Sequence, residues 1–227
     1  MKNIAPTDKT DDLELSSAKV EYLDELDLLV FQLQVRGEAG GTIPQAHGEL
    51  DGAPVLGYVF PTTLDPGDVW FTNADANSII ALAVVSHPDF DDTPLWDENN
   101  DGDFDNDGAV YHTHWVALAP DDRVEGGFSV EEIAEHEMSR CLPPTNPQMP
   151  MYMDSPGFSV VLQEDILRVL VPAQRVNYNT GFKFDALSGY MQVNQSIEDR
   201  PLLGVYEIYN ILSGDLNMTY TIKHRSA

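Results

Sequence analysis

Two apolar runs, Ser78–Ser86 and Ala109–Ala119, constrain the fold of this chain most strongly. A membrane-spanning helix needs about 20 apolar residues, so both runs are too short for one, but each suits a strand that is buried on both faces. The residues between the runs are strongly acidic. We therefore expect two adjacent central strands, joined by a long loop whose conformational freedom a bound ion suppresses.

The joining loop, which we place at residues 89–108, ends in a stretch with acidic or amide side chains at alternate positions. This stretch, residues 97–108, reads DENNDGDFDNDG, and each half of it closes on a glycine. Oxygen donors this close together repel one another unless a cation lies among them, and calcium takes about six to eight oxygen ligands. The predicted calcium ligands are Asp97, Asn99, Asp101, Asp103, Asp105 and Asp107.

The acidic stretch resembles the calcium loops of EF-hands, dockerins and thrombospondin type 3 repeats. Asp97, Asn99, Asp101 and Gly102 match the first, third, fifth and sixth positions of those loops, so the resemblance implies calcium binding. The last position, where an EF-hand has a glutamate, is Gly108, and the final ligand has to come from elsewhere. The candidates for it are Asp107, Asp89, Asp91, Asp92, Asp121 and Asp122.

The acidic stretch also leaves two alternatives open. A second, overlapping register begins at Asp103, which gives the loop room for two ions. The other alternative is a solvated acidic loop or a disordered linker that binds no ion.

A second group of candidate ligands is His112 and His114, just after the acidic loop. Residues two apart in a strand face the same side, so the pair could present two imidazoles to zinc, copper or iron. His47 and Glu49 have the same spacing and could complete such a site from another strand. The alternatives are that the pair lies on the exposed face of a half-buried strand, or that His114 serves a second calcium ion.

The histidine segment resembles the metal-binding strand of α-carbonic anhydrases and, less closely, the His-x-His of cupins. It lacks the second histidine-bearing strand of the anhydrases and the glutamate that follows the pair in cupins. Because no third ligand is identified, the transition-metal interpretation stays the alternative one. Met149, Met151 and Met153 could hold copper or serve a haem, although such methionines more often fill gaps in a core.

The remaining pattern predicts a mainly β protein, either an antiparallel β-sandwich or a barrel. Many short strands are separated by Gly, Pro and Asn, and one short helix is expected near residues 129–141, with Ser129 as its cap. Residues 1–12 are expected to form a flexible arm and residues 13–227 a single domain. The segment 16–37, SSAKVEYLDELDLLVFQLQVRG, resembles the first strand pair of DOMON-type sandwich domains, which bind haem or sugars, and implies only the fold.

The charge of the chain limits its partners. It has 38 acidic and 12 basic residues, and the net charge of -26 argues against nucleic acid or an anionic membrane surface as a partner. We expect no membrane insertion, because no apolar segment is long enough. Calcium loops of this kind suit an extracellular medium, so we expect a secreted or periplasmic protein whose signal peptide has been removed.

These observations predict a calcium-binding module for a carbohydrate or protein ligand, with a role in binding rather than catalysis. If Trp70, Trp96 and Trp115 are exposed on one face, they would stack on sugars. The alternative is a zinc, copper or iron metalloenzyme or redox-metal protein that uses His112 and His114. The sequence assigns no catalytic residue and leaves the oligomeric state open, and the single cysteine, Cys141, excludes a disulfide within the chain.

Overall fold

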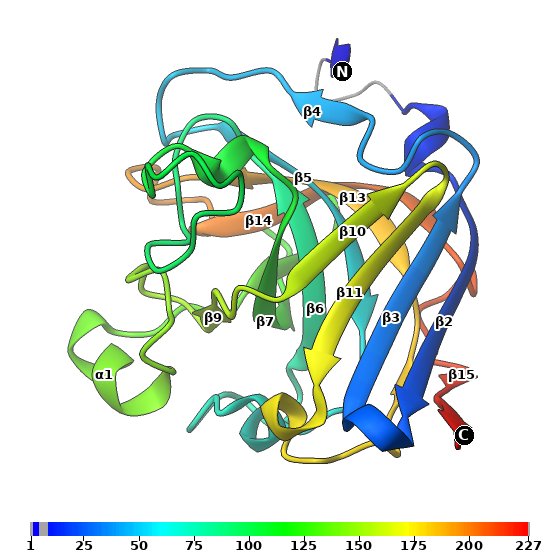
Figure 1. The fold of residues 1–227 in the computed structure, drawn as a ribbon. Helices are drawn as coiled ribbons and strands as arrows, with labels where there is room; N and C mark the ends of the chain where they lie inside the picture. Colours follow the sequence, from blue (N-terminus) through cyan, green and yellow to red (C-terminus); the bar gives the residue numbers. More distant parts are fainter. Residues whose placement is uncertain (1, 5–8, 227) are drawn as a thin grey trace.

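The computed structural model describes residues 2–4 and 9–226, which form a mainly β protein (Figure 1). The largest sheet contains β5 (Ala53–Pro61), β6 (Ile79–Ser86), β7 (His112–Pro120), β8 (Phe128–Val130), β9 (Met153–Asp154), β13 (Leu187–Val193) and β14 (Leu203–Ile211). A second sheet contains β2 (Leu15–Leu23), β3 (Leu28–Val35), β10 (Ser159–Gln163), β11 (Ile166–Pro172) and β16 (Lys223–Arg225). Two small sheets pair β1 (Lys2–Ile4) with β4 (Thr42–Pro44) and β12 (Lys183–Phe184) with β15 (Tyr220–Thr221).

The largest sheet closes into a barrel. Its strands follow the order β6, β5, β13, β14, β8 and β7, and β7 pairs back with β6, while β9 lies beside β7. Every pairing around this ring is antiparallel. The pairing of β6 with β7, in which Ala83 lies opposite His114, confirms that the two apolar runs form adjacent strands on either side of the acidic loop.

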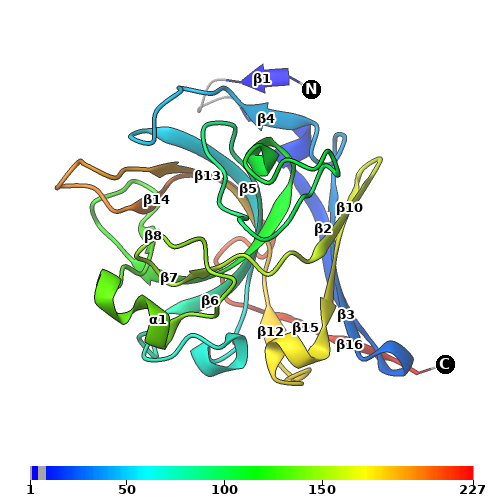
Figure 2. The same ribbon diagram turned by 60° about the vertical axis from the view of Figure 1, so that its left-hand side comes forward.

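The second sheet packs against the outside of the barrel, as the two views of the ribbon show (Figures 1 and 2). The interface is a core in which Phe31 and Val169 of the sheet meet Tyr58 and Trp115 of the barrel. The rings of Phe31 and Trp115 lie 6.3 Å apart, edge to face. The molecule therefore combines a barrel with a sandwich-like layer, whereas we expected one or the other. Two pairings, β1 with β4 and β2 with β16, are parallel and depart from the expected antiparallel pattern.

A second core fills the inside of the barrel. Ala81, Ala83 and Val85 of β6 face inward, as do Val116 and Leu118 of β7. The residues between them face the core outside the barrel. Burial of both faces explains why these strands have continuous apolar sequences instead of alternating ones.

The expected helix is shorter than the sequence suggests. The α-helix α1 covers only Met138–Cys141, and Ser129, the expected cap, lies in β8, where it pairs with Gly204 of β14 and Ala119 of β7. These pairings close the barrel, so tertiary hydrogen bonding overrides the local helical signal. The remaining helical segments are the 3-10 helices η1 (Asp11–Leu13), η2 (Asp24–Leu26), η3 (Pro66–Val69), η4 (Asp107–Ala109), η5 (Glu135–Glu137) and η6 (Ala173–Val176).

The expected flexible arm, residues 1–12, falls partly on residues 1 and 5–8, which lie outside the described residues. Its last part belongs to the folded domain: Asp12 is buried, and its Oδ1 accepts a hydrogen bond of 3.0 Å from the Thr42 hydroxyl. In the described part of the chain, no helix is long and apolar enough to cross a bilayer.

Candidate metal centre

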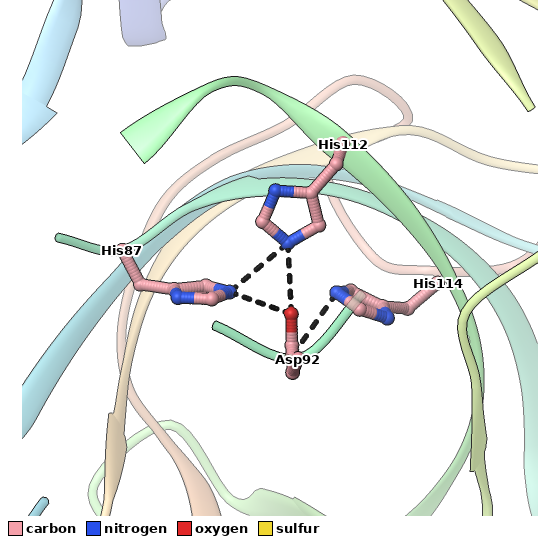
Figure 3. Close-up of side chains that lie close together, drawn as sticks. All are labelled: His87, Asp92, His112 and His114. Carbon is pink, nitrogen blue, oxygen red and sulfur yellow. Dashed lines mark hydrogen bonds and ion pairs between the residues drawn. The ribbon is translucent and has the colours of Figure 1, made fainter. Parts of the chain in front are cut away.

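Three histidines and one aspartate meet at one end of the barrel interior (Figure 3). His87 directly follows β6, Asp92 lies in the connection between β6 and β7, and His112 and His114 lie in β7. One donor atom from each of the four side chains lies within 4.8 Å of the others. The prediction that His112 and His114 share a face is confirmed, but the pair is fully buried and does not lie on an exposed face.

The barrel strands explain why these side chains converge. On β6, the inward row of Ala81, Ala83 and Val85 continues at alternate positions to His87. On β7, the inward row continues in the opposite direction, from Val116 to His114 and His112. The sequence analysis missed His87 and considered Asp92 only for calcium. His87 could have been predicted from its position, because it is separated by an even number of residues from the inward-facing residues of the apolar strand.

The four donor groups have the spacing of ligands around one ion. The Oδ1 atom of Asp92 lies 3.1 Å from Nε2 of both His87 and His112, and Oδ2 lies 3.2 Å from Nε2 of His114. The Nε2 atoms of His87 and His112 are 3.0 Å apart. Zinc–nitrogen bonds of about 2.0 Å in a tetrahedral site place neighbouring ligand atoms about 3.3 Å apart, which is close to these separations.

Hydrogen bonds on the far side of each ring fix the protonation of the histidines. The Nδ1 atoms of His87 and His112 lie 3.1 and 2.7 Å from the backbone carbonyl oxygens of Phe90 and Val110, which only accept. Nδ1 of His114 lies 3.2 Å from the Ser155 hydroxyl, whose single proton is donated to the carbonyl oxygen of Asp92 at 2.6 Å. Each Nδ1 therefore donates, and a ring that is neutral presents an unprotonated Nε2 to the centre.

This arrangement brings lone pairs together with no hydrogen between them. Oδ1 of Asp92 and Nε2 of His114 are buried and have no hydrogen-bond partner. The exposed fraction of each of the four side chains is between 1% and 5%, so water does not compensate. Buried lone pairs without a partner are costly, and one cation between them would remove that cost at every contact.

The pKa values show that the centre attracts positive charge. Burial alone would raise the pKa of Asp92, but rings that carry a proton hold it well below its usual range, through the charges of His114 and His87 and hydrogen bonds from His112 and His114. Burial lowers the pKa of His112, but the hydrogen bond and charge of Asp92 outweigh this effect and raise it. For His114, burial prevails and its pKa is lowered. A proton on Nε2 of His112 provides a hydrogen for only one of the close contacts between the four donor atoms. A metal ion would interact with all four donor atoms.

The end of the acidic loop packs directly against the centre. The backbone N–H of His87 donates to the carbonyl oxygen of Gly108 at 2.8 Å. A Cβ atom at Gly108 would lie 2.1 Å from the carbonyl oxygen of Phe90 and 2.5 Å from that of His87. The backbone N–H of Asp107 donates to Oδ2 of Asp91, the neighbour of Asp92, at 2.8 Å. The loop therefore helps to position two of the four groups.

The predicted calcium ligands themselves do not form a comparable group in the described part of the chain. Most are exposed, and several accept hydrogen bonds from the loop's own backbone, as Asp97 does from the N–H groups of Asp101 and Gly102. Asp107 differs, because it is fully buried and accepts from the backbone N–H groups of Glu98 and Asn99. Calcium binding by this loop stays a prediction.

Two other groups of residues considered from the sequence do not come together. His47 and Glu49 are exposed in the segment between β4 and β5 and are not part of the buried group, whose other two members are His87 and Asp92. Trp115 is only 1% exposed and lies in the core between the barrel and the second sheet, so it cannot share a sugar-binding face with Trp70 and Trp96.

Comparisons with known proteins add little. No family model matches the chain, and no solved structure matches it. A stretch of 113 residues is 33% identical to part of a proline–tRNA ligase of Bifidobacterium animalis subsp. lactis, and the match covers 46% of this chain but only 19% of the ligase. Because so little of that protein is matched, the similarity assigns neither a fold nor an activity to this chain.

Proposed function

We propose that this protein is a transition-metal protein in which His87, Asp92, His112 and His114 hold one divalent ion. The observation that carries the proposal is the convergence of three unprotonated Nε2 atoms and a carboxylate in a buried site. A mainly nitrogen donor set excludes calcium, which prefers oxygen ligands, and suits zinc, iron or copper. The function considered second in the sequence analysis is therefore the one that the geometry supports best.

The chemistry of such a centre follows from its burial. The protein supplies up to four ligands, and the rings are held in one orientation by hydrogen bonds from their Nδ1 atoms. Structural metal sites use four protein ligands, whereas catalytic sites keep one position for water or substrate. None of the four described side chains is exposed to solvent. The ion would therefore link β6, β7 and their connection and stabilise the barrel at this end.

Elemental analysis of protein purified without added metal tests the proposal. We expect about one transition-metal ion per chain in the wild type and almost none in the double variant His112→Ala/His114→Ala. The double variant His47→Ala/Glu49→Ala is the matched control, because it removes the same kinds of side chain from an exposed segment and should keep the ion.

Asp92→Asn is a second variant that distinguishes the loss of a ligand from a folding defect. It keeps the shape of the side chain and removes its charge. It should bind metal much more weakly while its circular dichroism stays that of a folded β protein. A wild type that holds no transition metal after reconstitution with zinc, iron(II) or copper would contradict the proposal. Equal metal contents in the two double variants would contradict the assignment of the ligands.

Calcium binding by the acidic loop is a second proposal, for a different part of the chain. One observation supports it: Gly102, at the sixth loop position, has a φ of 86°, the left-handed conformation that the turn of a calcium loop requires. A carbohydrate or protein ligand and a secreted or periplasmic location stay predictions. The two metal proposals are compatible, because the six predicted calcium ligands include none of the four residues of the buried centre.

A further inference from the structure

An apolar cavity lies directly beside the candidate metal centre, inside the barrel. Its volume is about 50 Å³. One water needs about 10–15 Å³ of such space, so the cavity has room for a molecule of only a few non-hydrogen atoms. Among the described residues that line it, His87, Asp92 and His114 are the only polar ones, and the others are aliphatic residues, methionines, phenylalanines, a proline and a glycine.

The inward rows of β6 and β7 explain how the centre and the cavity meet. Ala83, Val85 and Val116 line the cavity, and the histidines follow them at the end of the same rows. Because Asp92 and two histidines form part of the cavity wall, an ion bound to these buried side chains would face the cavity. A polar or charged ligand would find no other partner there, so the cavity favours an uncharged apolar one.

A groove on the surface reaches the same place from outside. It has a volume of about 630 Å³, and it shares Phe90, Met149 and Val193 with the wall of the cavity. The Phe90 ring stacks on the imidazole of His87, with the ring centroids 4.1 Å apart and the planes 9° apart. These three side chains separate the surface groove from the interior, and Phe90 also touches a proposed metal ligand.

We propose that the barrel cavity binds a small apolar molecule of the size of dioxygen next to the metal ion, and that the molecule passes between Phe90, Met149 and Val193. The proposal rests on the proposed function, because it names the ligand class of the same centre. Met149 and the neighbouring cavity residues Met151 and Met153 then act as apolar, adaptable lining and not as copper ligands.

Xenon is the probe for the test, since it is apolar and monatomic and enters dry cavities. We would record xenon-129 NMR spectra of the full chain loaded with zinc(II) and, separately, with cobalt(II), after measuring the metal content of both. We expect saturable xenon binding to the zinc form. In the cobalt form, the shift or relaxation of bound xenon should change strongly, because the paramagnetic ion lies beside the cavity.

Filling the cavity should abolish this binding. Ala83→Leu places a larger side chain into it, and Val55→Ile is a milder second variant in case the first fails to fold. Ala76→Leu, at an exposed alanine, is the matched control and should bind xenon as the wild type does. The proposal is overturned if the wild type binds no xenon, or if the folded cavity-filling variants bind xenon as the wild type does. It is also overturned if cobalt(II) does not change the signal of bound xenon. Absence of metal from the wild type overturns the proposed function instead, whatever xenon does.

The passage has its own test. Phe90→Ala should accelerate xenon exchange several-fold in protein that is loaded with zinc(II) and compared with the wild type at equal measured metal content. Phe104→Ala is the matched control, because Phe104 is 46% exposed in the acidic loop and lines neither cavity nor groove. Equal exchange rates in the wild type and the Phe90→Ala variant would show that the ligand takes another route.

Discussion

Two groups of candidate metal ligands lie in or beside the connection between β6 and β7, and they are built in opposite ways. In the buried centre, hydrogen bonds hold the far side of each ring and leave two of the facing atoms, Oδ1 of Asp92 and Nε2 of His114, without a partner. In the acidic loop, the side chains are mostly exposed and their oxygens accept hydrogen bonds from the loop's own backbone. The first arrangement is organised for an ion before the ion binds, whereas the second already satisfies much of its own bonding. The two groups therefore differ in how much of the ligand arrangement is set before an ion binds.

The two glycines of the acidic loop offer the strongest test of this contrast. Gly108→Ala places a Cβ within 2.5 Å of two backbone oxygens, which has to displace the segment that holds His87. We expect a loss of about 2–4 kcal/mol in the free energy of unfolding and a loss of more than about 100-fold in transition-metal affinity. Chemical denaturation and competition with a chelator measure the two effects.

Gly102→Ala is the control for that experiment. A Cβ at Gly102 meets nothing within 4 Å, although its φ of 86° makes alanine strained by about 1–2 kcal/mol. The transition-metal affinity of this variant should stay that of the wild type. Similar metal affinities in the two glycine variants would mean that the loop does not position the buried centre.

The interaction that orients the His114 ring can be removed without removing a ligand. Ser155→Ala deletes the hydroxyl oxygen that accepts the Nδ1 proton of His114, and we expect metal affinity to fall about 10–100-fold. Ser86→Ala is the matched control, since its buried hydroxyl lies in the same region but donates to the carbonyl oxygen of Ala109. Competition with a chelator measures the metal affinity of both variants. Equal losses of metal affinity would argue against a specific role of Ser155.

The pH should change the buried centre in a defined direction. Because the pKa of His112 is raised above 6.5 in the metal-free protein, a metal ion has to displace the His112 proton at any pH below that raised pKa. Metal affinity should therefore rise by about tenfold per pH unit until His112 has lost its proton. Calorimetry in buffers of different ionisation enthalpy should detect about one proton released per ion, and metal binding without proton release would contradict the assignment.

The stability of the metal-free protein should also depend on pH. The raised pKa of His112 contributes stability that is fully present below pH 6.5 and is lost as the pH rises through the higher folded-state value. The lowered pKa of His114 contributes stability above pH 6.5 that is lost as the pH falls through the lower value. The contribution of the two rings should therefore be largest near pH 6.5. Urea denaturation of the wild type and of His112→Ala/His114→Ala at several pH values would measure this contribution. It is the difference between the two proteins in the pH dependence of their free energies of unfolding.

The smallest effect should come from the acidic loop. If calcium binds only the folded protein, each tenfold excess over its dissociation constant should add about 1.4 kcal/mol to the free energy of unfolding. Asp101→Asn, which removes one exposed charge, should reduce this gain and leave the transition-metal content unchanged. An unfolding temperature that does not respond to calcium would show that the loop is a solvated acidic segment.

The strand patterns predicted the fold better than they predicted the site. The uninterrupted apolar runs correctly indicated strands buried on both faces, because each separates two cores. The expected helix does not begin at Ser129, because β8 owes its conformation to pairing with β7 and with β14, which lies far away in sequence. Local patterns report local preferences, and the pairing that closes a barrel is not among them.

Half of the buried centre could be predicted from sequence, and the physical reason is spacing. His112 and His114 lie two residues apart on one strand, so their shared face follows from strand geometry alone. His87 and Asp92 join them only through the antiparallel register of β6 with β7 and the path of the connection. Asp92 was also obscured by its acidic neighbours, among which its side chain has no distinguishing feature in sequence.

The burial of all four groups has a consequence for the rate at which the centre exchanges its ion. An ion held there can enter or leave only when the connection from His87 to Val110 moves away from the barrel and breaks the hydrogen bonds that anchor it. The lifetime of the bound ion is then set by this local opening and not by the strength of the metal–ligand bonds alone. The protein would retain its ion through dilution or brief exposure to a competitor, and amide hydrogen exchange at His87 would follow the same opening.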